Sequence, residues 1–306
     1  MLTSFFSTSK PINTIAVILY MTVAFWISQD GLFTTDFSGY AFAKACIAFA
    51  IYVFTMFVLN FISRKNDLSK RNTYKVILFA AFTASIPGAL KTLPLLASGL
   101  FIMLALRRIM SLRSGKEIDA KLFDAGTWIA VAILCYFWSW VYIVVLILAL
   151  MFFAIGNIRQ WFLPLLGIGC VAIFSYCYVL YHGDGWTKIV PENLISFDFE
   201  IYSEVHVLIA SSFLLSIFLW SVWPYVQQIQ NKRVSQRPAY RVVIALALVS
   251  LLPIIFTASK NGGELYFFTF PLAIIVTYFI ESAKDTYFKE ALLWSVLILP
   301  VIIHIL

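Results

Sequence analysis

The sequence predicts an all-α protein, a polytopic bundle of about eleven transmembrane helices with its N-terminus in the cytoplasm. Of the 306 residues, 62% are hydrophobic and only 12% are charged, and the mean hydropathy is +0.91. A soluble domain is about half apolar and one quarter charged. The apolar residues form successive long segments, and the basic residues cluster between these segments. These observations exclude a water-soluble fold.

Each predicted element is an apolar segment close to the roughly 20 residues that a helix needs to cross the hydrocarbon. In chain order, we expect them near residues 12–28, 41–62, 76–90, 92–106, 124–138, 140–157, 161–181, 205–226, 242–258, 264–281 and 290–306. The connections are short, so residues 1–306 are expected to form a single membrane domain. Its longest outer loop is expected at residues 182–204.

The first segment resembles the start of a secretory signal, because Lys10 precedes its apolar run. The residues that follow it, Gln29-Asp30-Gly31, lack the small-x-small pattern of a cleavage site. We therefore expect an uncleaved first span.

The apolar stretch from Val76 to Leu106 needs an internal break. Its 31 residues would form one helix roughly 46 Å long at 1.5 Å per residue, too long for a single crossing. Basic clusters flank both of its ends, so it must cross an even number of times. Pro87-Gly88, Lys91 and Pro94 supply the break, and we expect two short helices or a re-entrant pair with Lys91 near the apex.

Two further long stretches also divide. One contains Trp138-Ser139-Trp140, where two indole rings suit an interfacial turn in an aromatic belt. The other contains residues 259–263, Ser-Lys-Asn-Gly-Gly, which is a turn sequence. Each division separates two crossings.

The distribution of basic residues predicts the orientation, because cytoplasmic loops carry an excess of Lys and Arg. With the N-terminus inside, the inner face receives 18 of the 22 basic residues: Lys10, Arg64, Lys65, Lys70, Arg71, Lys75, Arg107, Arg108, Arg113, Lys116, Lys121, Arg159, Lys232, Arg233, Arg237, Arg241, Lys284 and Lys289. The outer face keeps Lys44, Lys91, Lys188 and Lys260, with Asp30, Asp36, Asp184, Glu192, Asp198, Glu200, Glu204 and Glu264.

Several classes of chemistry find no support. The net charge of +7 lies in clusters between apolar spans and not on one amphipathic face, so nucleic acid is not an expected partner. The sequence has no Walker loop, GxSxG, HExxH or GxGxxG signature. Ligand-type side chains at Asp198, Glu200, Glu204 and His206 match no established metal motif. We predict neither a cofactor nor a metal site.

The candidate site residues are ionisable groups at the outer edge of the hydrocarbon, where a charge is costly and therefore a functional candidate. Asp30 and Asp36 are the candidate catalytic residues. Lys91, Lys260 and Glu264 are the candidate substrate-binding residues. In one outward-facing cleft, a carboxylate would act as general base and a lysine would hold a phosphate. The alternative is that each is an interfacial residue in contact with water.

The densest basic stretch is predicted on the inner side. It consists of Arg107, Arg108, Arg113, Lys116 and Lys121, interrupted by two acidic residues. Orientation by positive charge explains it, and contact with anionic lipid head groups is the alternative.

Three stretches carry a resemblance to known proteins. They are residues 104–109 leading into 121–126, residues 159–167, and the N-terminal residues 3–6. Over nearly the whole chain, the sequence resembles an uncharacterised family of multi-pass inner-membrane proteins from Bacteroidota. The resemblance implies a location in the bacterial inner (cytoplasmic) membrane and no particular activity.

The chain is also similar to the GT-C glycosyltransferases, which take sugars from polyprenyl-phosphate carriers on the outer face. Those enzymes place a catalytic acidic residue in the first outer loop, where this chain has Asp30 and Asp36. Many of them end with a helix rich in tyrosine and proline, like residues 264–273. The resemblance implies transfer from a lipid-linked substrate, although the usual Asp-Glu pair and large outer domain are absent.

Three functions follow from these observations. The first is a non-catalytic integral subunit of an envelope assembly for secretion, motility or polymer export, with membrane lipids and other integral subunits as partners. The second is a GT-C-like transferase that acts on a lipid-linked substrate at the outer face. The third is a transporter or lipid flippase. Whether the protein is an enzyme is left open.

Overall fold

The computed structural model describes residues 1–29, 38–182, 195–258 and 260–305. Every regular element in these ranges is a helix. Eight helical segments there are long and apolar enough to cross a membrane: Pro11–Ser28, Gly39–Lys65, Leu93–Ser114, Ile158–His182, Val205–Asn231, Arg237–Phe256, Gly263–Ser282 and Thr286–Ile305. Two shorter apolar helical segments are Tyr74–Ala84 and Phe137–Phe152. The protein is an all-α multi-pass membrane protein.

The helices follow one another with short connections. The first half of the chain forms α1 (Leu2–Phe6), α2 (Pro11–Ser28), α3 (Gly39–Lys65), α4 (Tyr74–Ala84), α5 (Pro87–Lys91), α6 (Leu93–Met110), η1 (Ser111–Ser114), α7 (Ile118–Cys135), η2 (Phe137–Val141) and α8 (Tyr142–Phe152). The second half forms α9 (Ile158–His182), η4 (Glu200–Ser203), α10 (Val205–Asn231), α11 (Arg237–Val249), α12 (Leu251–Phe256), η5 (Gly263–Leu265), α13 (Tyr266–Ser282) and α14 (Thr286–Ile305).

The helices end and begin at the turn residues that the sequence analysis identified. Pro87 begins α5 and Pro94 lies in the first turn of α6, because proline lacks the N–H that the helix interior requires. Lys91 ends α5 between the two prolines. The Trp138 region forms the 3₁₀ turn η2 between α7 and α8. Helix boundaries therefore lie at both of these predicted divisions.

The predicted segment boundaries differ from the helix ends where charged residues extend a helix. α7 begins at Ile118, before the segment predicted at residues 124–138, and its first turns carry Asp119 and Lys121. α10 continues to Asn231, beyond the predicted end near residue 226. Apolar residues mark the part of a helix that suits hydrocarbon, whereas the backbone hydrogen bonds continue into the polar turns.

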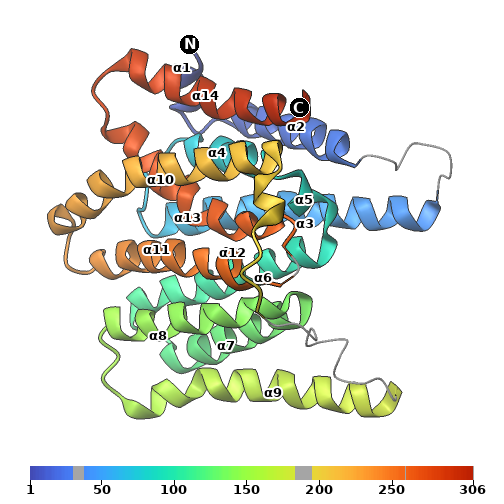
Figure 1. Ribbon diagram of the computed structural model, residues 1–306. Coiled ribbons are helices and arrows are strands. Elements are labelled where there is room, and N and C mark those ends of the chain that lie inside the picture. Colours follow the sequence, from blue (N-terminus) through green and yellow to red (C-terminus); the bar gives the residue numbers. More distant parts are fainter. Residues whose placement is uncertain (30–37, 183–194, 259, 306) are drawn as a thin grey trace.

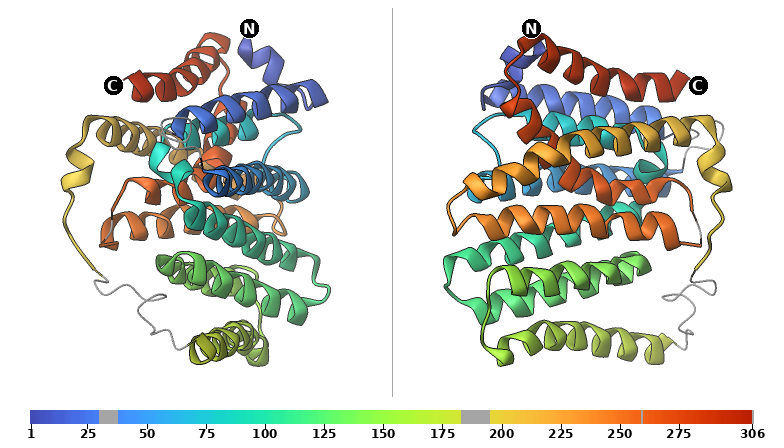
Figure 2. Two further views of the ribbon diagram at one scale, coloured as in Figure 1. Left: turned by 90° about the vertical axis from the view of Figure 1, so that its right-hand side faces the viewer. Right: turned by 60° about the vertical axis from the view of Figure 1, so that its left-hand side comes forward.

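The long helices lie side by side with alternating directions (Figure 1). The ends of α3, α6, α10 and α13 meet at one end of the bundle, where Asp67 contacts Gln236 and Arg113. We call this the basic end. The opposite end holds the connections α4–α6 and α12–α13, with Gly88 close to the backbone of Asn261. The two views of Figure 2 place α9 and α14 at opposite edges of the bundle.

Helices α4 and α13 form the centre of the bundle. All residues of α4 are buried, and α13 is buried along almost its whole length. The two helices pack on each other, with Phe79 stacked 5.7 Å from Phe270 between ring centroids. Gly99 on α6 makes room for α13, since a Cβ atom there would lie 2.3 Å from the ring of Tyr266. Small residues allow this close approach of membrane helices.

Helix α9 lies at the edge of the bundle and packs on α7. The two helices meet at glycines. A Cβ atom at Gly126 would lie 2.2 Å from the carbonyl oxygen of Pro164, and one at Gly167 would lie 2.4 Å from that of Phe123. The contact therefore depends on the absence of side chains at both positions.

The short helix α1 was not predicted from the sequence. It lies against α14, where Glu290 accepts hydrogen bonds from the N–H groups of Leu2 (2.6 Å) and Thr3 (3.1 Å). Glu290 also accepts a hydrogen bond from the hydroxyl of Thr3 (2.6 Å). A carboxylate satisfies the free N–H groups of a helix start, so the first and last helices of the chain are joined.

Candidate functional site

The predicted catalytic residues Asp30 and Asp36 lie outside the described residues. The candidate transferase site is therefore represented by Lys91, Lys260 and Glu264, all at the end of the bundle opposite the basic end.

Lys260 is occupied by the protein's own backbone. Its Nζ donates hydrogen bonds to the carbonyl oxygens of Ser196 (2.5 Å) and Thr257 (2.8 Å). The same ammonium lies 4.7 Å from the centroid of the Phe199 ring, a cation–π distance. Lys260 thus holds the segment before α10 against the α12–α13 connection.

Glu264 lies in η5 at the start of α13 and is only 2% exposed. Its Oε1 accepts a hydrogen bond from the backbone N–H of Asn261 (3.3 Å). Its Oε2 is buried and has no hydrogen-bond partner among the described residues. An unsatisfied buried acceptor costs free energy, which makes Glu264 an unusual feature of this end of the bundle.

Lys91 lines a small cavity of about 170 Å³, together with His206 on α10 and Asn261. Lys260 and Glu264 are not among the residues that line this cavity. The three candidate substrate-binding residues therefore share one end of the molecule without facing one described cavity.

The acidic residues before α10 engage their near neighbours. Asp198 accepts a hydrogen bond from the N–H of Glu200 (2.9 Å), and Glu204 lies 3.3 Å from His206. Within the described ranges, no three His, Cys, Asp or Glu side chains are grouped so as to hold a metal ion.

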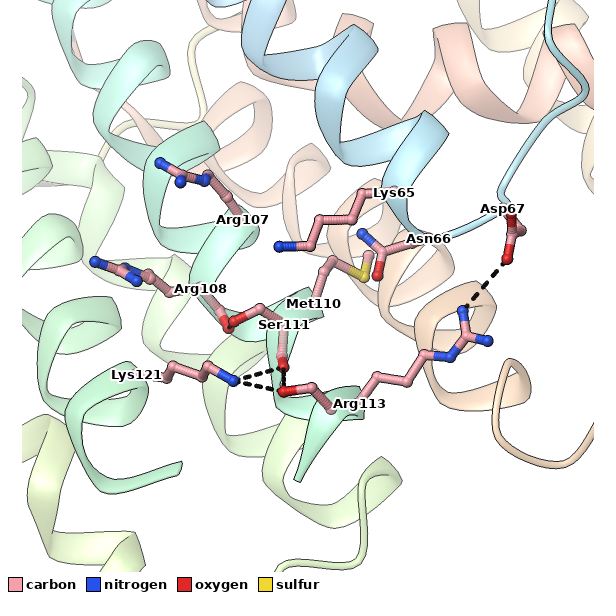
Figure 3. Close-up of a pocket in the computed structure, with 10 residues that line it drawn as sticks. Lys65, Asn66, Asp67, Arg107, Arg108, Met110, Ser111, Arg113 and Lys121 are labelled. Carbon is pink, nitrogen blue, oxygen red and sulfur yellow. Dashed lines mark hydrogen bonds and ion pairs between the residues drawn. The ribbon is translucent and has the colours of Figure 1, made fainter. Parts of the chain in front are cut away.

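A larger polar cavity lies at the basic end (Figure 3). Its volume is about 370 Å³. We call it the basic pocket, and its lining residues are Lys65, Asn66, Asp67, Arg107, Arg108, Met110, Ser111, Arg113, Ser114 and Lys121. Five of the ten are basic and one is acidic. Such a lining attracts anions.

Three segments that lie apart in the sequence build the basic pocket. Lys65 is the last residue of α3, Arg107 and Arg108 lie in the last turn of α6, and Lys121 lies in the first turns of α7. The chain reverses between α6 and α7 at Gly115, whose φ of +66° is readily adopted only by glycine. This reversal brings Lys121 back beside the end of α6.

Three of the basic side chains are held in place by internal contacts. Arg108 pairs with Asp124 at 2.8 Å, and Arg113 lies 3.6 Å from Asp67. Lys121 donates hydrogen bonds to the carbonyl oxygen of Ser111 and to the hydroxyl of Ser114. Figure 3 shows Lys65 and Lys121 extending toward the space between their helices, whereas Arg113 extends to Asp67. These contacts hold the walls of the pocket.

Lys65 and Arg107 have a different environment. Their charged groups lie 5.4 Å and 5.2 Å from the centroid of the same ring, that of Phe61. Neither forms an ion pair with a residue in the described part of the chain. Their positive charges are free to bind an anion from outside the protein.

The sequence pointed to part of the basic pocket. It singled out the basic stretch from Arg107 to Lys121 and its alternative role in contact with anionic lipids. It did not predict that Lys65 joins this stretch, because more than 40 residues separate them. The one local indication was that Lys65 follows Phe61 by four positions at the end of an apolar span, which places the two side chains on one face of the helix.

Comparison with known proteins gives a family. No curated protein matches the chain, and no solved structure matches it either. A family model, described as a family of unknown function (DUF6427), matches residues 4–305. The chain therefore belongs to this family of unknown function.

Proposed function

We propose that the protein binds the phosphate-bearing head group of an anionic membrane lipid in its basic pocket. The observation that carries this proposal is the convergence of five basic side chains from α3, α6, η1 and α7 on one 370 Å³ cavity. Orientation by positive charge explains basic residues scattered over one face. It does not require them to share a cavity whose cations outnumber its carboxylates.

The surface next to the pocket supports a lipid as the ligand. Phe54, Phe57 and Phe61 are 52%, 42% and 43% exposed, and their spacing puts them on one side of α3. This stripe ends at Phe61, beside the charged groups of Lys65 and Arg107. A head group in the pocket would therefore place its acyl chains along an exposed aromatic stripe.

We also propose eleven crossings, with the N-terminus and the basic end on the cytoplasmic side of a bacterial inner membrane. The support is the agreement between eleven predicted apolar segments and the helical order of the described chain. Helix α7 and the paired shorter helices α4–α5 and η2–α8 complete the set beyond the eight long spans. The basic end then faces the anionic cytoplasmic leaflet.

The physiological role that we propose is that of an integral subunit of an envelope assembly, with secretion, motility or polymer export as its candidate processes. The contacts of Lys260 and Glu264 support this role over a transferase, because both side chains serve internal contacts and neither lines the Lys91 cavity. Purification in mild detergents should recover companion subunits. A lone monomer under several mild conditions would contradict this role.

Lipid binding is tested on the full-length protein purified in an uncharged detergent. Added dioleoyl phosphatidylglycerol should raise the thermal midpoint, whereas dioleoyl phosphatidylcholine should not. At 100 times Kd, the bound lipid should stabilise the folded protein by about 2.7 kcal/mol. The double variant Lys65→Gln/Arg107→Gln should lose most of this effect. Both side chains are exposed, so the variant is expected to fold.

The matched control is Arg233→Gln/Lys284→Gln, which removes two exposed basic residues that do not line the basic pocket. It should keep the full response to the lipid. Equal loss in the two double variants would mean that general surface charge, and not the pocket, attracts the lipid.

A further inference from the structure

We infer that the basic pocket selects a doubly charged phosphate group, a phosphomonoester or a diphosphate, over the singly charged phosphodiester of common phospholipids. This inference rests on the proposed lipid-binding function and names its ligand class. It follows from the balance of charges, from the two unpaired cations and from the aromatic stripe beside them.

The charges around the basic pocket leave a positive excess. Five basic residues line it, and three carboxylates act on them: Asp67 near Arg113, Asp124 paired with Arg108, and Glu117 near Lys121. The other two, Lys65 and Arg107, have no carboxylate partner in the described part of the chain, so the pocket keeps two uncompensated positive charges there. A dianion neutralises this excess, whereas a monoanion leaves one charge unmatched.

The two unpaired cations are suited to one phosphate. Arg107 offers a planar fork that matches two phosphate oxygens, and Lys65 offers a compact charge on a flexible stem. Both residues line the basic pocket, and their charged groups lie 5.4 Å and 5.2 Å from the centroid of the same Phe61 ring, so they share one region of the pocket wall. Arg108, Arg113 and Lys121 keep their internal partners while this region is filled.

A phosphomonoester has the matching chemistry. It carries about −1.5 to −2 charges at pH 7 and presents three strong acceptor oxygens. A phosphodiester carries one charge and only two free oxygens, so it offers one fewer acceptor to the cations. The pocket volume of about 370 Å³ lies in the usual range of small-ligand sites.

The exposed stripe of Phe54, Phe57 and Phe61 indicates that this phosphate is attached to a lipid. Free phosphate would use the cations alone. A lipid phosphate would gain apolar contact with the stripe in addition.

The test compares two lipids with the same acyl chains. Binding of dioleoyl phosphatidic acid and of dioleoyl phosphatidylglycerol to the full-length protein is measured by native mass spectrometry from an uncharged detergent, at equal concentrations and pH 7.5. We expect tenfold or greater preference for phosphatidic acid. Lys65→Gln and Arg107→Gln should each reduce this preference to about twofold or less, while Arg233→Gln/Lys284→Gln keeps it.

The remaining outcomes separate the two proposals. Equal affinity for both lipids, lost in Lys65→Gln/Arg107→Gln, would overturn the dianion selectivity and leave the proposed lipid binding intact. Binding of neither lipid would overturn both. A third arm uses sodium phosphate alone: protection from heat equal to that given by phosphatidic acid would overturn the lipid origin of the phosphate. Phe57→Ala should weaken phosphatidic acid binding and leave any effect of sodium phosphate unchanged.

Discussion

Glu290 on the last helix holds Thr3 at the start of the chain through two hydrogen bonds, one from the backbone N–H at 3.1 Å and one from the hydroxyl at 2.6 Å. The two residues are 287 positions apart. Tyr74 on α4 adds a third contact, because its hydroxyl donates a hydrogen bond to the carbonyl oxygen of Thr3 at 2.6 Å. The N-terminal helix is therefore tied both to the edge and to the centre of the bundle.

Replacing this carboxylate should loosen α1 without unfolding the bundle. In Glu290→Ala, the N–H groups of Leu2 and Thr3 lose their acceptor. We expect faster hydrogen–deuterium exchange over residues 2–6, with little change in the thermal midpoint, because α1 packs chiefly on α14 at the edge of the bundle. Lys289→Ala, at the neighbouring position, is the control. Unchanged exchange over residues 2–6 in Glu290→Ala would contradict the role of this contact.

Adding a methyl group at the glycines of the α7–α9 contact should separate the two helices. Gly126→Ala and Gly167→Ala would each place a Cβ atom against a backbone carbonyl of the other helix. Overpacking of this kind costs about 1–3 kcal/mol, and backbone atoms cannot move aside as a flexible side chain can. The measurement is the thermal midpoint together with proteolysis of α9.

Gly169→Ala is the matched control, because a Cβ atom there would meet nothing within 4 Å. It lies on α9, two residues after Gly167, and makes the same chemical change. A Gly126→Ala protein as stable as Gly169→Ala would show that α9 does not pack on α7 through these glycines.

Removing the ammonium of Lys260 should release the segment before α10. Lys260→Met keeps most of the unbranched side chain and deletes the ammonium that donates to Ser196 and Thr257. Hydrogen–deuterium exchange over residues 195–203 should increase, since the segment loses its anchor to the α12–α13 connection. Lys44→Met, at an exposed position of α3, should not change it. Identical exchange in the two variants would contradict this anchoring role of Lys260.

The orientation is testable by labelling single cysteines. The four native cysteines, Cys46, Cys135, Cys170 and Cys177, are first changed to alanine. Lys284→Cys at the basic end and Glu200→Cys before α10 are then exposed to a membrane-impermeant maleimide in spheroplasts. Glu200→Cys should react at once, and Lys284→Cys only after the membrane is permeabilised. The reverse pattern would place the basic end outside.

The individual helices could be predicted from the sequence because their causes are local. About twenty apolar residues favour a membrane-spanning helix, and Pro87, Pro94 and the Gly262-Gly263 pair lie at helix starts and turns, where these residue types are favoured. Helix ends were less accurate, as at Ile118, because charged residues outside the hydrocarbon continue a helix without adding to its apolar pattern.

The candidate site shows the limit of the same reasoning. The ionisable residues at the membrane edge could be found by their cost in hydrocarbon, but their partners could not. Lys260 contacts Ser196 across 64 positions, and Lys65 shares the Phe61 ring with Arg107 from another helix. Which charges meet depends on how the helices pack side by side.

The sequence by itself determined that this protein is helical, multi-pass and strongly asymmetric in charge, because hydropathy and charge are properties of each segment alone. Only the tertiary structure decided that α4 and α13 form the centre, that glycines join α9 to α7, and that basic residues from three segments surround one pocket. Apolar helices present similar surfaces to lipid and to one another, so close packing selects their neighbours. The unpaired charges of Lys65 and Arg107 become a candidate site only through that selection.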